Sequence, residues 1–142
     1  ETLVELKAYI DAGEVRYVLK DFPLTSHANA VPAAVAARAA GEQGKYWEMH
    51  DLLFAQQSEW TESSTDELTA RWVIYAEKLG LDVDKFKQDL ASDPLKDQIV
   101  AGRQLGDVTG VRSTPTTIVN GVMYEGLIKP DELHQVVKEA KQ

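Results

Sequence analysis

Residues 110–126 read GVRSTPTTIVNGVMYEG. Thr116–Asn120 is a β-branched run, and Val122–Glu125 forms a second strand-like run after Gly121. An Asn-Gly pair between two such runs is the strongest short-range signal for a hairpin turn. Pro115 stands just before the first run, where a residue without an N–H does not interrupt a ladder. The stretch therefore predicts a two-stranded antiparallel hairpin.

Helical patterns dominate on both sides of this hairpin. Pro130 suits a first helical position, and the apolar residues after it have helical spacing up to Ala140. Ser64 and Glu67 have the spacing of a capping box, and Asn29 is predicted to cap the alanine-rich helix that follows it. Upstream helices are predicted over Asn29–Ala40, Lys45–Gln57, Ser64–Leu79, Asp82 or Asp84 to Leu90, and from Asp93 onward.

The N-terminal part predicts one helix and one strand. Leu3, Leu6 and Ile10 share a helical face in Glu1–Ala12, and Gly13 is a stop signal. Residues 14–22, EVRYVLKDF, are rich in Val, Tyr and Leu, which is typical of a buried strand. The whole pattern predicts an α/β domain whose core contains Leu6, Ile10, Val15, Tyr17, Leu19, Trp72, Ile118, Val119, Leu133 and Val137.

Composition narrows the function classes. The 142 residues carry a formal net charge of −8, which disfavours binding to the phosphate backbone of nucleic acids. No apolar run approaches the ~18 residues of a membrane-spanning helix. The sequence contains no cysteine, so it provides no disulfide, thiolate metal ligand or thiol nucleophile.

Other polar groups do not form a recognisable catalytic or metal-binding pattern. His27 is predicted in a loop, His50 packed on a helix, and His134 on a solvated helix face, without metal-ligand spacing. Carboxylates fit the solvated faces and caps of helices. Gly102, Gly106 and Gly110 recur every four residues, which indicates packing of a helix against a sheet and a C-cap rather than a phosphate-binding loop. We therefore predict no catalytic residue, no metal and no cofactor within these residues.

Three stretches resemble the DsbA-like branch of the thioredoxin superfamily. They are VRYVLKDFPL at 15–24, AARAAGEQGKYWEMHDLLF at 36–54, and GVRSTPTTIVNGVMYEG at 110–126. The resemblance implies a single thioredoxin-like domain over residues 1–142, with a helical insertion over about 29–108. It also implies a central first strand that precedes the first helix, so we expect the sheet of these residues to be incomplete and further residues to precede Glu1.

The same resemblance implies a bacterial thiol–disulfide oxidoreductase of the periplasm or another extracytoplasmic space. In that family a Cys-x-x-Cys motif at the start of the first helix exchanges disulfides with substrates. Because these residues contain no cysteine, they are expected to be the body of such an enzyme without its redox cysteines. The implied partners are extended or unfolded protein substrates and a membrane protein that recycles the redox state.

The resemblance places substrate binding at Ser113, Thr114 and Pro115. In the family the corresponding X-Pro bond is cis and lies beside the dithiol, and the backbone before it pairs with an incoming peptide. A cis Thr114-Pro115 bond is therefore predicted. Two alternatives stay open: a redox-inactive thioredoxin-like module that binds peptides or acts as a chaperone, and a relative of the kappa-type glutathione transferases whose groove binds glutathione.

Overall fold

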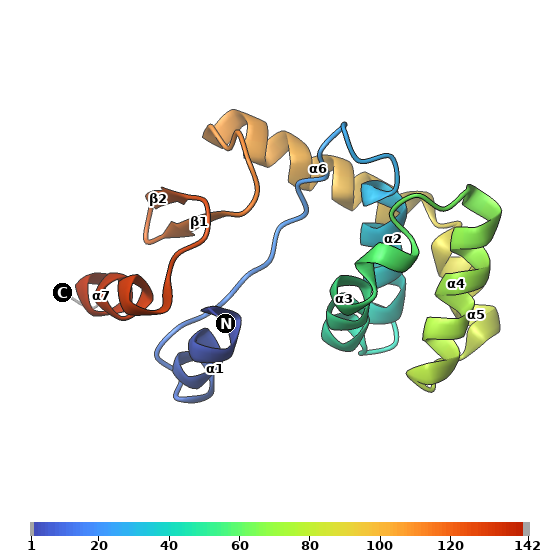
Figure 1. Cartoon of the computed structure of the whole chain (residues 1–142), viewed down its shortest axis with the longest axis horizontal. Helices are drawn as coiled ribbons and strands as arrows, with labels where there is room; N and C mark the ends of the chain where they lie inside the picture. The colour runs from blue at the N-terminus through green and yellow to red at the C-terminus, as the bar shows by residue number, and fades with distance from the viewer. Residues whose placement is uncertain (1, 141–142) are drawn as a thin grey trace. The chain divides into compact units, whose positions relative to one another are not determined.

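The computed structural model describes residues 2–140 (Figure 1). Its elements are α1 (Thr2–Asp11), α2 (Ala30–Gly41), α3 (Tyr46–Ala55), the short 3-10 helix η1 (Gln57–Glu59), α4 (Thr65–Lys78), α5 (Val83–Leu90), α6 (Asp93–Thr109), β1 (Thr116–Val119), β2 (Val122–Glu125) and α7 (Pro130–Ala140). They form two compact units. We call residues 21–105 the helical unit, and residues 2–20 with 106–140 the hairpin unit.

The helical unit is built around the small side chains of α2. Five alanines of this helix are buried, and their small size allows neighbouring helices to approach closely. Helix α2 packs against α3, α4 and α5. The large buried side chains that complete this core are Met49, Leu53, Trp60, Leu68, Trp72, Tyr75, Phe86 and Leu95.

Asn29 contributes to this unit differently from the prediction. Helix α2 begins at Ala30, but the Asn29 side chain forms no cap hydrogen bond. Its Nδ2 instead donates to the carbonyl oxygens of Trp60, Thr61 and Ser63, at 3.0, 2.9 and 3.0 Å. Asn29 thus fixes the chain that leads into α4, because that loop offers carbonyl acceptors within reach of its amide.

Helix α4 begins with the predicted capping box. The Ser64 backbone N–H and the Ser64 hydroxyl both donate to Glu67 Oε2, at 2.7 and 2.8 Å. In return, the Glu67 backbone N–H donates to the Ser64 side chain. The hydrogen bonds that Ser64 donates lower the pKa of Glu67 below its ordinary value of 4.5. The bond from the Ser64 backbone contributes most, and the bond from its hydroxyl comes second. The prediction of this cap is confirmed.

The capping box gives α4 an acid-sensitive N-terminus. Because the folded-state pKa of Glu67 lies below its unfolded value, its stabilisation is present above about pH 4.5 and is lost as pH falls through the folded pKa. Carbon-13 carboxyl titration by NMR is expected to give Glu67 a midpoint below 4.5. Ser64→Ala, which leaves the backbone donor but removes the hydroxyl, should move that midpoint upward. An unchanged midpoint would show that the Ser64 hydroxyl does not contribute to the lowered pKa of Glu67.

The hairpin unit contains the predicted hairpin. Strands β1 and β2 pair antiparallel, with Thr116 opposite Glu125 and Val119 opposite Val122. Asn120 and Gly121 both have positive φ angles, 47° and 88°, as a two-residue type I′ turn requires. Helix α7 begins at Pro130 as predicted and buries Leu133, Val136 and Val137. The core of the hairpin unit consists of Ile128 with Leu133 and Val137. The partly buried side chains packed against this core are Leu6, Tyr9, Val15 and Tyr124.

The predicted strand over Glu14–Phe22 is wrong. Residues 15–24 lie outside any helix or strand, although Val15, Tyr17 and Leu19 are half-buried and alternate with exposed neighbours. The side chains of residues 15–20 therefore alternate between half-buried and exposed, as they would in a strand. Within residues 2–140 the one sheet consists of β1 and β2. The segment is extended without a described strand beside it, and a strand requires a ladder partner.

The predicted core is partly correct. Trp72, Leu133 and Val137 are buried, and Leu6, Val15, Tyr17, Leu19 and Val119 are half-buried. The prediction that Ile10 and Ile118 are core residues is wrong, because they are 37% and 49% exposed. Ile118 lies between half-buried neighbours on β1, so alternation turns it to the opposite face of the hairpin. Periodicity identifies a face of an element but does not show whether another layer covers it.

Candidate polypeptide-binding site

The three predicted substrate-binding residues lie together in an exposed loop before β1. Ser113, Thr114 and Pro115 are all exposed to solvent. The Thr114-Pro115 peptide bond is cis, which confirms the predicted isomer.

Hydrogen bonds anchor this loop on both sides of Thr114. The Thr116 hydroxyl donates to the Ser113 carbonyl oxygen at 2.7 Å. The Gly126 N–H donates to the Pro115 carbonyl oxygen at 2.8 Å, beside the end of β2. Thr114 therefore lies in an exposed loop that is fixed to the hairpin.

The structure gives each of the predicted histidines a separate environment. His27 is exposed in the helical unit. His50 packs among the rings of Tyr46, Trp47 and Phe54, as predicted. No group of three potential metal-ligating side chains occurs in the part of the chain that the structure describes.

His134 has contacts that the sequence did not predict. Its side chain is 57% exposed, as expected of a solvated face, but its Nδ1 lies 2.5 Å from the Tyr9 hydroxyl in a hydrogen bond. Its Nε2 lies 3.4 Å from Glu5 Oε2. These contacts join α7 to α1 within the hairpin unit. Residues so distant in sequence are not connected by any local pattern.

Sequence reasoning also missed a cluster around Asp21 in the helical unit. Arg38 Nε on α2 donates to Asp21 Oδ2 at 2.7 Å, and Arg38 Nη2 pairs with the same oxygen. Arg38 Nη1 donates to Gln98 Oε1 on α6 at 2.9 Å. The side chains of Arg38 and Asp21 are 23% and 10% exposed, so the ion pair is largely removed from water.

Gly102 lies at a close backbone contact in this cluster, but its partner is Asp21 and not the sheet that the prediction gave it. A Cβ at position 102 would lie 2.8 Å from the Asp21 carbonyl oxygen, so only glycine lets α6 approach this closely. Next along α6, Arg103 Nη1 donates to the Pro23 carbonyl oxygen at 2.8 Å, and its guanidinium lies 4.1 Å from the centre of the Phe22 ring. The sequence signal was Gly102 itself, but its partner could not be inferred.

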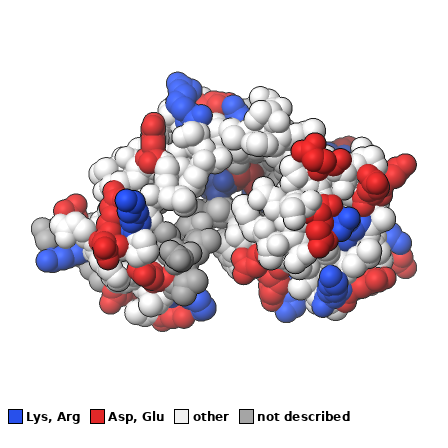
Figure 2. Space-filling model, in the orientation of Figure 1, with Lys and Arg blue, Asp and Glu red and all other residues white. Residues whose placement is uncertain are grey.

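Acidic side chains are distributed among fewer basic ones on the face shown in Figure 2. This agrees with 23 Asp and Glu against 15 Lys and Arg in the chain. None of the helices in residues 2–140 is both long and apolar enough to cross a membrane.

Comparison with known proteins identifies the family of this chain. A family model described as thioredoxin matches residues 1–139. The chain belongs to the thioredoxin-like family. A crystal structure of a thioredoxin-like oxidoreductase from Silicibacter pomeroyi superimposes with a TM-score of 0.76 and 25% identity, covering 99% of this chain and 77% of that one. The predicted thioredoxin-like fold class is thus confirmed.

Two relatives of this thioredoxin-like chain are longer proteins that it matches in part. It is 41% identical over 133 residues to the Na+/H+ antiporter NhaA 3 of Salinispora tropica, a match that covers 92% of this chain and 19% of the antiporter. It is 28% identical over 127 residues to a Rickettsia typhi protein named, provisionally, a protein-disulfide oxidoreductase, covering 84% of this chain and 43% of that protein. The chain therefore spans less than half the length of either relative.

Proposed function

We propose that this thioredoxin-like chain is the polypeptide-holding part of a protein thiol–disulfide oxidoreductase. An extended segment of an unfolded substrate pairs with the backbone of Thr114, flanked by Ser113 and Pro115, as a short β-bridge. The observation that carries the proposal is the exposed loop whose neighbours are anchored by Thr116 and Gly126. The similarity to a thioredoxin-like oxidoreductase supports it.

The redox step needs groups that these residues do not supply. In disulfide exchange a thiolate attacks one sulfur of a disulfide, a mixed disulfide forms, and the other sulfur leaves as a thiolate. The 142 residues contain no cysteine. Under the proposal both thiols come from residues outside them, and this chain positions the substrate.

The proposal extends to location and partner. The resemblance to the DsbA-like branch supports an extracytoplasmic site of action and a membrane protein that restores the redox state of the thiols. Relatives of this chain that are named Na+/H+ antiporters support an association of such domains with membrane proteins.

A second candidate is a peptide-binding module without redox chemistry. The absence of cysteine from the sequence favours it. It uses the same loop at Thr114, so the two functions differ only in the dithiol. Activity of the complete gene product in reduction of insulin disulfides would support the oxidoreductase, whereas peptide binding without that activity would support the module.

Peptide binding at the loop is testable with two variants of Thr114. Thr114→Pro removes the backbone N–H that a β-bridge uses, whereas Thr114→Ala keeps it. With fluorescein-labelled, reduced and carboxymethylated lactalbumin as the probe, anisotropy should show about three- to tenfold weaker binding for the Pro variant. The Ala variant should bind within about twofold of the parent chain, since it keeps both backbone groups.

The controls separate the binding site from general unfolding. Circular dichroism must show the same helix content in both variants, and binding should not change between oxidised and reduced glutathione buffers. Equal affinity of the Pro variant and the parent chain would remove Thr114 from the proposed site. Competition by glutathione itself would favour the glutathione-transferase alternative.

A further inference from the structure

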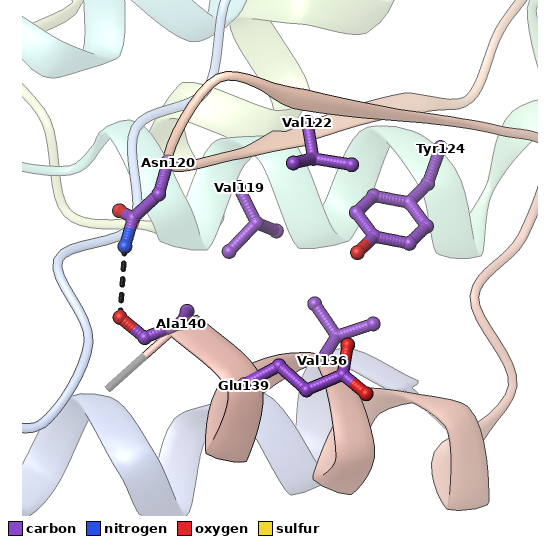
Figure 3. A pocket seen from close by; sticks show the side chains of 7 residues that line it. All are labelled: Val119, Asn120, Val122, Tyr124, Val136, Glu139 and Ala140. Atoms are coloured by element: carbon purple, nitrogen blue, oxygen red, sulfur yellow. Dashed lines mark hydrogen bonds between the residues drawn. The ribbon is translucent and has the colours of Figure 1, made fainter. Parts of the chain in front are cut away.

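A cavity of about 220 Å³ lies between the hairpin and α7, and residues 113–115 are not among those that line it (Figure 3). It is formed entirely within the hairpin unit. Its lining residues are Val119, Asn120, Val122, Tyr124, Val136, Glu139 and Ala140. This volume exceeds the ~150 Å³ of an engineered protein cavity that binds benzene. A compact ring or a short aliphatic chain therefore fits.

The walls of the cavity are apolar. Figure 3 shows Val119, Val122 and the Tyr124 ring on the hairpin side, facing Val136 on α7. Val136 is buried, whereas Val122 is 56% exposed and lies where a ligand can enter. Contact with these side chains favours the hydrocarbon part of a ligand.

The polar groups around the cavity are mainly acceptors. Asn120 Nδ2 donates to the Ala140 carbonyl oxygen at 3.0 Å, which holds the turn of the hairpin to the last residue of α7 at one end of the cavity (Figure 3). Gln135 Nε2 donates to Glu139 Oε1 at 2.6 Å, which fixes a carboxylate that has acceptor capacity at its second oxygen. Tyr124 adds a hydroxyl group to the lining.

The one charged residue among those that line the cavity is acidic. None of its seven lining residues is Lys, Arg or His, and one is Glu139. The cavity also lies at the C-terminal end of α7, where the helix dipole favours positive charge. The cavity therefore combines an apolar interior with a rim suited to a cation.

We propose that this cavity binds a small organic cation, with a primary ammonium group on a compact apolar body. The apolar body contacts Val119, Val122 and Val136. The ammonium group donates to the Glu139 carboxylate, which lies beside Val136 (Figure 3). This binding site is distinct from the loop that we propose for polypeptides, and neither proposal depends on the other.

Three probes of similar shape and different charge test this proposal. They are benzylamine, benzyl alcohol and benzoate, added to the full chain while the methyl signals of Val119, Val122 and Val136 are followed by NMR. Benzylamine should shift these signals with a dissociation constant on the order of 1 mM. Benzyl alcohol should bind about three- to fivefold more weakly, and benzoate more weakly still. Added salt should weaken only benzylamine binding towards that of the alcohol.

Matched variants locate the charge and the cavity. Glu139→Gln should weaken benzylamine about three- to fivefold without changing benzyl alcohol. Glu132→Gln removes a carboxylate from the same helix but not from the cavity lining, and should change neither. Val122→Phe fills the cavity from its exposed side and should weaken both probes at least about tenfold, with unchanged circular dichroism.

Three results would overturn the proposal. The absence of methyl shifts at these three valines, with benzylamine at about ten times the expected dissociation constant, would show that the cavity does not bind the probe. Equal binding of all three probes would show that the cavity does not select a cation. Equal benzylamine affinity of Glu139→Gln and the parent chain would show that Glu139 does not hold the ammonium group.

Discussion

Arg38→Met is expected to destabilise the helical unit by about 3 kcal/mol. Methionine keeps the apolar stem of the side chain but removes the guanidinium that pairs with Asp21 and bonds to Gln98. The Asp21 carboxylate, with 10% of its side chain exposed, would then be left without its charge partner. Breaking a buried pair from one side is costly because the remaining charge is poorly solvated.

Urea unfolding followed by tryptophan fluorescence measures this effect selectively. All three tryptophans, Trp47, Trp60 and Trp72, lie in the helical unit, so the signal reports that unit. Arg71→Met is the matched control, because the Arg71–Glu59 pair is more exposed, at 32% and 44%, and is worth less than about 1 kcal/mol. Adding Asp21→Asn to Arg38→Met should restore part of the loss. Equal effects of Arg38→Met and Arg71→Met would show that burial of the Asp21 pair has no consequence.

Trp72→Ala should have a still larger effect, a loss of about 4 kcal/mol. The Trp72 side chain is 2% exposed and lies between two other rings. Its ring centre is 5.6 Å from that of Trp60, in a T-shaped arrangement, and 5.8 Å from that of Tyr75. Trp60 in turn donates its Nε1–H to the Leu53 carbonyl oxygen at 2.9 Å. Alanine would leave a cavity in this core and would remove both ring contacts.

The control for this prediction is Trp47→Ala. It removes one tryptophan from the same unit, but Trp47 is 46% exposed, and we expect a loss of about 1 kcal/mol. Trp72→Phe keeps a ring and should cost less than half as much as Trp72→Ala. Thermal unfolding by circular dichroism provides a second measurement that does not depend on tryptophan emission. A loss of less than about 2 kcal/mol in Trp72→Ala would show that the core collapses around the missing ring.

Local chemistry made several elements predictable. The capping box at Ser64 and Glu67, the Asn120-Gly121 turn and the start of α7 at Pro130 all depend on residues within a few positions of one another. Such signals act through short hydrogen bonds or restricted dihedral angles, which the sequence specifies directly. The cis bond at Thr114-Pro115 and the loop site came from family resemblance, because no local rule distinguishes them.

The errors concern contacts between distant residues. The segment from Val15 to Phe22 has strand composition, but strand formation depends on a neighbour that its own sequence does not specify. Asn29 satisfies carbonyl groups about thirty residues away instead of capping α2. The Asp21–Arg38 pair and the Tyr9–His134 hydrogen bond likewise join segments whose proximity exists only in the folded chain.

The division into units has a consequence for the order of folding during synthesis. The helical unit is one continuous stretch, residues 21–105, and its helices can pack as soon as that stretch leaves the ribosome. The hairpin unit combines α1 with β1, β2 and α7, from opposite sides of that stretch. At about 5–20 residues per second, α1 must wait several seconds for α7. During this time α1 lacks its native contacts with α7, such as the Tyr9–His134 hydrogen bond, so the nascent chain is most vulnerable to misassociation before α7 emerges.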